Sequence, residues 1–370
     1  MRRVLIVITI CIVVFLHNSY CFAEETNIKI HGDVRLRHQS EKKEDDKHVR
    51  DRLRIRARVG ITGIIQDQWS GVIGLASGGT DPRSTNQTLD NTFSTKSIML
   101  DYAFIKYGPI PSLAFFAGKI KRENIIWQPT DLLWDSDVNP EGMAFVIDSQ
   151  VSNQLSIFLN GAYMILDEQS ATDEDIAMNV VQPGIFIAFN NVIKLKTAVG
   201  IYTFNNFKEN ATTMNMIGSL SNTTTQNTYA YDYNSTNVSI ELAFENLNEF
   251  LKFISIFGDS VYNPDPDIKK DDERSGYCYG IKIGSKKVNK LGSWQFKILN
   301  RRLEKDAWVD FLPDSDFYGG KTGYQGIEAI IIIGLADNVT LSLDHYNTDA
   351  IDKNNSNKQN ILQADINIKF

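Results

Sequence analysis

Residues Gln359–Phe370 read QNILQADINIKF, and this stretch decides the fold class. From Leu362 to Phe370 the even-numbered residues are apolar and the odd-numbered residues are polar. Because the side chains of a β-strand point alternately to its two faces, the pattern predicts a strand with one apolar and one polar face. The last strand of a sheet leaves an unpaired edge unless it finds a second partner, so we expect it to close against the first strand of the chain.

Two segments near the N-terminus repeat the alternation with stronger charges. In residues 28–37, apolar side chains and a glycine alternate with lysine, histidine, aspartate and arginine. In residues 52–61, aliphatic residues alternate with four arginines. A soluble sandwich would bury the apolar face and expose the arginines, whereas a membrane barrel would turn the aliphatic residues to lipid and the arginines to a water-filled lumen.

The lengths of the connections separate these two alternatives. Similar segments predict about sixteen strands, each near the length that crosses a bilayer at a tilt, and the connections alternate between short and long. A transmembrane antiparallel β-barrel with both termini on the periplasmic side has this pattern, because its periplasmic turns are short and its extracellular loops are long. The long connections are expected at residues 38–51, 78–96, 121–142, 165–182, 204–235, 258–275, 301–322 and 347–358.

The N-terminal segment has the features of an export signal. Two arginines precede an apolar run at residues 4–16, and a small-residue cleavage site ends at Ala23. We therefore predict a signal peptide over residues 1–23 and a single outer-membrane barrel domain over residues 24–370. A lipid on Cys21 is the alternative, although the residues before this cysteine are not the small and aliphatic ones that lipid attachment requires.

The composition narrows the range of partners. The chain of 370 residues is 42% hydrophobic and 22% charged, and its formal net charge is −7. It is too apolar to be disordered, and an acidic exported chain is a poor ligand for nucleic acids. Two of the three cysteines lie in the predicted signal peptide, so Cys278 is left without a partner for an internal disulfide.

The arginine row is the strongest functional signal. Successive side chains on one face of a strand lie about 7 Å apart, and such a file of like charges is too costly for a dry core. A solvated sheet face would account for the row without any function. We favour a pore wall that lowers the barrier for anions or for anionic parts of solutes, partly offset by Asp33 and Asp365. The predicted pore wall consists of Arg35, Arg37, Arg52, Arg54, Arg56 and Arg58.

The long connection at residues 121–142 is unusually apolar for an external loop. It carries two isoleucines, two leucines and two tryptophans between Ile125 and Trp134. Apolar groups on a surface need something to pack against, so we expect this third long loop to fold into the barrel and to narrow it. The carboxylates that it would bring opposite the arginines are Asp131, Asp135, Asp137 and Glu141.

The sequence offers no catalytic constellation and no strong metal motif. Acidic and amide residues from Asp135 to Glu141 have the alternate spacing of a calcium loop, but Pro140 occupies the position where an EF-hand requires glycine. A looser calcium site stays open as an alternative. The histidines show neither metal-ligand nor catalytic-triad spacing. We expect no enzymatic activity, no resident metal and no cofactor.

Several stretches of the mature chain carry a family resemblance. They read GDVRLR at 32–37, RDRLRIRARVG at 50–60, TDPRSTNQTL at 80–89, LDYAFIKY at 100–107, WDSDVNPEG at 134–142 and IFGDSVYN at 256–263. These stretches resemble the bacterial putative porin family, which comprises outer-membrane β-barrels of Gram-negative bacteria. The resemblance covers essentially the whole mature chain and is densest in its first third.

The resemblance implies a passive diffusion channel for small hydrophilic solutes or ions in the outer membrane of a Gram-negative bacterium, with residues 121–142 as the constriction loop. It also implies contact with outer-membrane lipid, recognition of Phe370 by the barrel-assembly machinery, and a homotrimer of the kind that general porins form. It identifies no solute. The alternative function is a structural or adhesive barrel that binds a partner through long loops such as residues 204–235, which are rich in asparagine, threonine and tyrosine.

Overall fold

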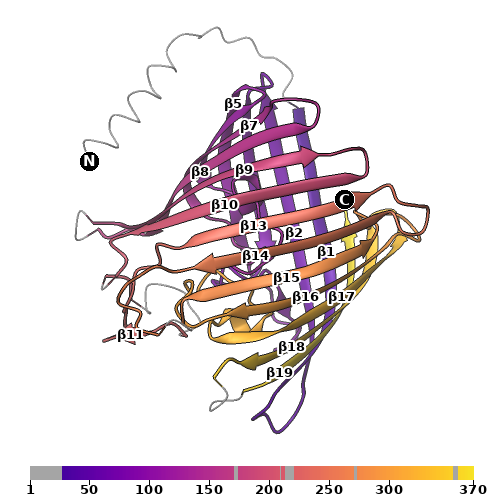
Figure 1. The fold of residues 1–370 in the computed structure, drawn as a ribbon. Helices are drawn as coiled ribbons and strands as arrows, with labels where there is room; N and C mark the ends of the chain where they lie inside the picture. Colours follow the sequence, from indigo (N-terminus) through magenta and orange to yellow (C-terminus); the bar gives the residue numbers. More distant parts are fainter. Residues whose placement is uncertain (1–26, 171–173, 209, 213–220, 271–272, 353–356) are drawn as a thin grey trace.

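The alternating segments pair edge to edge into a closed antiparallel β-barrel of sixteen long strands (Figure 1). The structure is a computed structural model and describes residues 27–170, 174–208, 210–212, 221–270, 273–352 and 357–370. The predicted signal peptide lies outside the described residues. Successive strands of the barrel are neighbours, so the predicted fold class is confirmed.

The barrel strands and the small elements in the loops are as follows. The barrel strands are β1 (Asn27–Lys43), β2 (Arg50–Ile65), β3 (Trp69–Ser77), β5 (Ile98–Ile110), β6 (Leu113–Lys119), β7 (Glu141–Gln150), β8 (Leu155–Asp167), β9 (Ile176–Ala188), β10 (Ile193–Asn205), β13 (Thr236–Glu245), β14 (Phe253–Tyr262), β15 (Ser275–Gly284), β16 (Trp294–Leu303), β17 (Tyr324–Ala336), β18 (Val339–Ala350) and β19 (Gln359–Lys369). The loops contain β4 (Gln87–Thr88), β11 (Thr224–Thr225), β12 (Thr228–Tyr229) and the short 3₁₀ turns η1 (Arg122–Asn124) and η3 (Tyr318–Gly320). Among the described residues, no helix has the length and apolar character needed to cross a membrane.

The first and last strands close the barrel. β1 and β19 pair in register, from Asp33 opposite Lys369 to Lys43 opposite Gln359. One step further, Gly32 and Phe370 exchange backbone hydrogen bonds of 2.9 and 3.0 Å. Both edges of β19 are therefore paired, one with β1 and one with β18. The closure predicted from the last strand is confirmed.

The barrel turns its apolar face outward. On β1, Val34 is 49% exposed and Arg37 is 5% exposed. On β2, the corresponding values are 47% for Ile61 and 8% for Arg56. A soluble sandwich would show the reverse, because its aliphatic side chains would be covered. This distribution suits a membrane barrel, which places aliphatic groups against lipid and polar groups around its lumen.

Several predicted loop boundaries are wrong by a few residues, and two are wrong by about six or seven. Residues 38–43 are expected in a loop but extend β1, because polar cross-strand partners such as Arg52 and Glu41, 2.7 Å apart, support the ladder there. β9 begins at Ile176 instead of residue 183. Its first lumen-facing residues are apolar and pack under inserted loops, so this segment lacks the apolar-polar alternation that marks the other strands.

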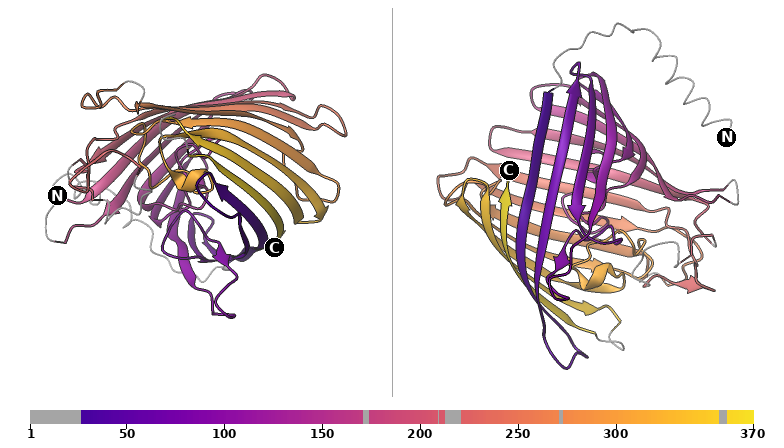
Figure 2. Two further views of the ribbon diagram at one scale, coloured as in Figure 1. Left: turned by 90° about the horizontal axis from the view of Figure 1, so that it is seen from below. Right: turned by 180° about the vertical axis from the view of Figure 1, so that it is seen from behind.

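Two of the long loops that fold into the barrel share an apolar core. The loop between β6 and β7 turns inward as predicted, and its Trp134 donates to the hydroxyl of Tyr202 on β10 at 3.4 Å. Residues 304–323, between β16 and β17, join it. Trp308 Nε1 of this second loop donates to the carbonyl oxygen of Leu133 at 2.9 Å. Seen from below in Figure 2, the second loop lies inside the ring of strands.

One side of the barrel wall carries the first inserted loop. Gln182 on β9 accepts from the amide of Trp127 at 2.8 Å and donates to its carbonyl oxygen at 2.7 Å. Asp259 on β14 accepts from the amide and the hydroxyl of Thr130 at 3.0 and 2.6 Å. Phe158, an apolar residue on the polar face of β8, packs edge-on against Trp127 with ring centres 6.4 Å apart. The loop is therefore fixed against the inner faces of β8, β9 and β14.

The barrel seam at Gly32 gives a first testable prediction. A Cβ at this position would lie 2.4 Å from the carbonyl oxygen of Arg58 and 2.7 Å from the ring of Phe370. We expect Gly32→Val to destabilise the barrel by about 1–3 kcal/mol, measured as a lower temperature for the heat-induced mobility shift in detergent electrophoresis. Gly71→Val is the matched control, because its Cβ would meet no atom within 4 Å. Equal losses in both variants would contradict the prediction.

Candidate functional site

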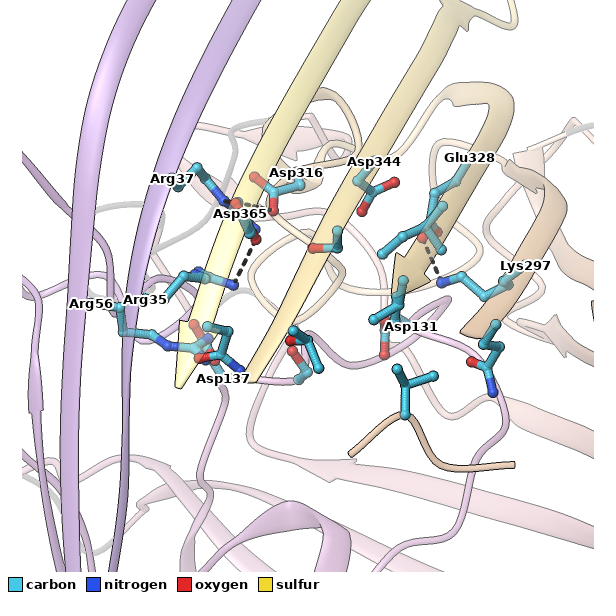
Figure 3. Close-up of a pocket in the computed structure, with 18 of the residues that line it drawn as sticks. Arg35, Arg37, Arg56, Asp131, Asp137, Lys297, Asp316, Glu328, Asp344 and Asp365 are labelled. Atoms are coloured by element: carbon cyan, nitrogen blue, oxygen red, sulfur yellow. Dashed lines mark hydrogen bonds and ion pairs between the residues drawn. The ribbon is translucent and has the colours of Figure 1, made fainter. Parts of the chain in front are cut away.

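A cavity of about 680 Å³ lies in the lumen between the inserted loops and the wall formed by β1, β2 and β16–β19. Figure 3 shows its charged lining, with arginines from β1 and β2 on one side and charged residues of β16, β17 and β18 on the other. A smaller cavity of about 420 Å³ shares Arg56 and Asp137 with the first. The charged faces of the strands therefore surround space inside the barrel.

Carboxylates hold the arginines of β1 and β2 in place. Arg37 donates to both carboxylate oxygens of Asp365 at 2.8 Å and to Asp316 at 3.2 Å. Asp33 accepts one hydrogen bond from Arg56 and one from Arg58, each 2.8 Å long. Such charge-assisted bonds fix the orientation of the guanidinium groups, and each carboxylate offsets part of the positive charge.

The other three predicted wall residues differ in their partners. Arg35 lines the larger cavity and lies 3.6 Å from Asp365. Arg52 pairs with Glu41 at 2.7 Å, and Arg54 donates to a glutamine side chain at 2.8 Å. All six predicted arginines thus follow the inner faces of β1 and β2. The larger cavity is lined by Arg35, Arg37 and Arg56, and the smaller one by Arg56 and Arg58.

Three of the four predicted loop carboxylates reach the larger cavity. They are Asp131, Asp135 and Asp137, and Asp137 lies 3.3 Å from Arg58. Glu141 is placed elsewhere. It is the exposed first residue of β7, where strand alternation turns it outward, and it pairs with Lys119 at 3.0 Å. The structure therefore does not bring Glu141 opposite the arginines.

The sequence analysis missed a second loop at the cavity. Residues 314–316, between β16 and β17, line it together with the first loop. The amide of Ser315 donates to Asp135 at 2.8 Å, and the amide of Asp135 donates to the carbonyl oxygen of Leu312 at 2.6 Å. The signal was present in the sequence, because residues 308–312 read WVDFL and are as apolar as the first loop.

Carboxyl groups crowd together where the two loops meet. Burial raises the pKa of Asp314 well above its usual range, and the negative charges of Asp135 and Asp316 raise it further. Burial and the charge of Asp137 raise the pKa of Asp135 in the same way. Burial alone would also raise the pKa of Asp316, but the guanidinium groups of Arg37, Arg54 and Arg35 together outweigh burial and lower that pKa. Protonation of Asp135 and Asp314 is thus favoured at the contact between the loops.

The wall opposite the arginines carries carboxylates. Glu328 on β17 pairs with Lys297 on β16 at 2.5 Å. Asp344 on β18 faces the same cavity, beside Glu328 (Figure 3). A solute in the cavity would therefore meet positive groups on one side and negative groups on the other. In the part of the chain that the structure describes, no group of three or more histidine, cysteine, aspartate or glutamate side chains is arranged to hold a metal ion.

Comparison with known proteins identifies the family. A family model described as "Putative porin" matches residues 42–250 and 229–370, which together span most of the chain. The chain belongs to this porin family. No curated protein gives a match to the sequence of this porin.

Two solved structures show the same fold. The outer membrane channel DcaP of Acinetobacter baumannii is 13% identical to this porin, with a TM-score of 0.51, and the alignment covers 95% of this chain and 99% of DcaP. OprB of Pseudomonas putida, in its high-pH structure, is 9% identical, with a TM-score of 0.56 and coverage of 93% and 94%. At these identities the likeness extends to the fold alone.

Family and fold together place the porin in the outer membrane as a channel. The short turns between strands then lie on the periplasmic side and the long loops on the extracellular side, as in other porins. Both inserted loops therefore enter the lumen from outside the cell. Phe370 lies beside β1 with its side chain on the outward face, at the periplasmic end of the barrel.

Because the carboxyl groups of Asp135 and Asp314 lie close together, we predict that the contact between the two inserted loops depends on pH. Because the pKa of Asp314 is raised in the folded protein, the contact is strongest below the ordinary pKa of aspartate and weakens as the pH rises toward the raised value. The measurement is hydrogen–deuterium exchange at the Ser315 amide, which donates to Asp135. Its protection factor should fall by about threefold or more between about pH 4 and about pH 8.

Asp314→Asn is the matched variant for this experiment. It keeps the side-chain oxygen that accepts from the amide of Asp316 at 2.9 Å but removes the charge, so the pH dependence should become shallower, and the part that remains comes from Asp135. Asp267→Asn, in a different loop and exposed to solvent, should leave the pH dependence unchanged. A fall in Asp314→Asn as steep as in the unaltered protein would show that the carboxyl pair is not its cause.

Proposed function

We propose that this porin is a passive diffusion channel for small hydrophilic solutes or ions. The observation that supports this most directly is the charged cavity inside a barrel whose outer face is apolar. Charged side chains in a narrow lumen replace part of the water that a solute loses on entry, and so lower the barrier to passage. The proposed pore wall is Arg35, Arg37, Arg52, Arg54, Arg56 and Arg58, and the proposed constriction carries Asp131, Asp135 and Asp137.

Passage through such a lumen requires no chemical step. The solute moves down its own concentration gradient, and the wall sets only the height of the barrier. More than one loop narrows the path, because residues 314–316, together with Arg83 and Asn86 of the loop between β3 and β5, line the cavity alongside the constriction loop. The hydrogen bonds between these loops hold the constriction in one shape, so selectivity by size and charge follows from fixed groups.

The alternative, an adhesive or structural barrel, depends on the loop at residues 204–235 reaching outward to a partner. Much of the described part of this loop faces inward instead. Tyr229 and Tyr233 are buried and donate to Asp310 at 2.8 Å and to Asp306 at 3.1 Å, both in the second inserted loop. Described residues that are bound to an inserted loop in this way are a poor platform for a partner, which favours the channel.

The proposal includes the route to the membrane and the assembled state. Export would use the signal peptide predicted at residues 1–23. The barrel-assembly machinery would recognise the last strand through Phe370, whose side chain is 63% exposed. A homotrimer is the proposed assembly, by likeness to general porins. Chemical cross-linking of the porin in native outer membranes would measure the number of subunits.

The channel function predicts steady ionic conductance of the purified full-length porin in a planar bilayer. Arg35→Gln removes one positive charge from the cavity while Asp365 keeps Arg37 as its partner. A unit charge about 10 Å from an ion in water is worth about 0.4 kcal/mol before salt screening. We therefore expect the cation-to-anion permeability ratio, read from the reversal potential in a salt gradient, to rise about twofold.

Lys252→Gln is the control for charge at a distance from the cavity, because Lys252 is exposed in the short turn between β13 and β14 and lines neither cavity. Its reversal potential should match that of the unaltered porin. Absence of conductance at every voltage would count against the channel. Conductance with an unchanged reversal potential in Arg35→Gln would instead remove Arg35 from the pore wall.

A further inference from the structure

Asp344 is a lumen carboxylate without a full set of partners. The residue is 8% exposed and lines the larger cavity from β18. Its Oδ1 has no hydrogen-bond partner among the described residues. The nearby Lys297 already binds Glu328 at 2.5 Å. A buried carboxyl oxygen with no hydrogen-bond donor is costly, and an ammonium group in the cavity would remove that cost.

Arg35 is the matching group on the opposite wall. Its Nε has no hydrogen-bond partner among the described residues, and its Nη1 lies 3.6 Å from Asp365. Asp365 is engaged by Arg37 through two hydrogen bonds of 2.8 Å, so it satisfies Arg35 only weakly. One hydrogen bond, to the side-chain oxygen of Asn86 at 2.6 Å, holds the Arg35 side chain in position. The guanidinium therefore retains capacity to bind an anionic group.

The strand register gives the distance between these two groups. Arg35 on β1 and Thr340 on β18 are both level with Asn367 on the intervening β19, and Asp344 lies further along β18. Strands about 4.8 Å apart and a rise of about 3.3 Å per residue place the two Cα atoms roughly 16 Å apart. Both side chains reach toward the cavity (Figure 3), which brings the charged ends to roughly 10 Å from each other.

We propose that the larger cavity binds short zwitterionic peptides, with the ammonium group at Asp344 and the carboxylate at Arg35. This inference rests on the proposed channel function and names the class of solute. An α-amino acid is too short, because its two charges are only about 3 Å apart, whereas an extended chain gains about 3.5 Å per residue. A tripeptide spans the required distance. The cavity of about 680 Å³ has the size of a small-molecule site.

A zwitterion fits the cavity better than a simple ion does. Asp344 Oδ1 and Arg35 Nε each lack a hydrogen-bond partner among the described residues, so a cation alone would leave the Arg35 Nε unsatisfied and an anion alone would leave the Asp344 oxygen unsatisfied. A solute with both charges satisfies both groups and brings no net charge into the lumen. Its polar middle would lie beside Asn367, whose Oδ1 also lacks a hydrogen-bond partner among the described residues and can accept from a peptide N–H.

The test is block of ion current through the full-length porin by tri-alanine. Tri-alanine should reduce the single-channel current in a saturable way, whereas alanine and the uncharged N-acetyl-tri-alanine amide should bind at least about tenfold more weakly, since each lost charge-assisted contact is worth about that factor. Calorimetry on the detergent-solubilised porin gives the same affinities independently of conductance.

Two variants assign the ends of the peptide. Asp344→Asn keeps the shape of the side chain and should weaken tri-alanine binding about tenfold, but should not affect N-acetyl-tri-alanine, which has no ammonium group. Arg35→Gln should weaken tri-alanine equally and should not affect tri-alanine amide, which has no carboxylate. His345→Gln, the outward-facing neighbour of Asp344, is the control and should bind like the unaltered porin.

The outcomes separate this inference from the channel itself. Normal conductance with equal affinity for tri-alanine and its doubly blocked form would overturn the inference and leave the channel standing. Unchanged affinity for tri-alanine in Asp344→Asn would also overturn the inference. Asp344 would then be protonated or bound to water, and would not bind the ammonium group of the peptide. If the porin does not conduct, the channel proposal fails, and the calorimetric affinities alone decide whether the peptide site exists.

Discussion

The rest of the structure depends on satisfying backbone hydrogen bonds in an apolar medium. An unpaired N–H or C=O group in lipid costs several kcal/mol, so a sheet that spans a membrane must close on itself. Here β1 and β19 provide the closure, and the pairing continues to Gly32 and Phe370 at the end of the chain. Closure also fixes which face points where, because a shift of one residue in register would turn the arginines of β2 toward lipid. The fold and the charge of the lumen therefore follow from one constraint.

A barrel of this width cannot be filled by its own inward side chains, and the inserted loops supply the missing interior. Trp134 and Trp308 form an apolar core inside the lumen, and this core gives each inserted loop an apolar surface to pack against. Polar groups on the wall, such as Gln182 and Asp259, satisfy the loop backbone. Because these anchors lie on β9 and β14, the cavity is left beside β1, β2 and β16–β19. The position of the cavity is thus decided by where the loops are attached.

Strand alternation carries most of what could be predicted from the sequence. It predicts the barrel, its outward apolar face and the inward arginines, because each depends on the local period of two. It does not identify contacts that combine distant segments. The start of β9 at Ile176 is hidden by loop packing, the loop at residues 304–323 binds Asp135 across the lumen, and Glu141 is turned outward by the start of β7. The first two depend on partners far apart in the chain, which a local pattern cannot specify, whereas the prediction for Glu141 is wrong because β7 begins two residues before the predicted strand.

The ion pairs change the meaning of the arginine row. Read as sequence, six arginines predict a strongly positive wall, but Asp33 bridges Arg56 and Arg58 within the β1–β2 hairpin, and Asp365 binds Arg37 across the β1–β19 seam. The pair between Arg37 and Asp365 joins the two strands that close the barrel, so it stabilises the seam from inside while backbone hydrogen bonds pair the strands edge to edge. A charge engaged in this way is less available to a passing solute. A solute in the lumen interacts mainly with the charged groups that lack a full set of partners. Arginines that are fully paired and arginines that are not lie on the same strand face, so one row contributes both to the stability of the barrel and to its selectivity.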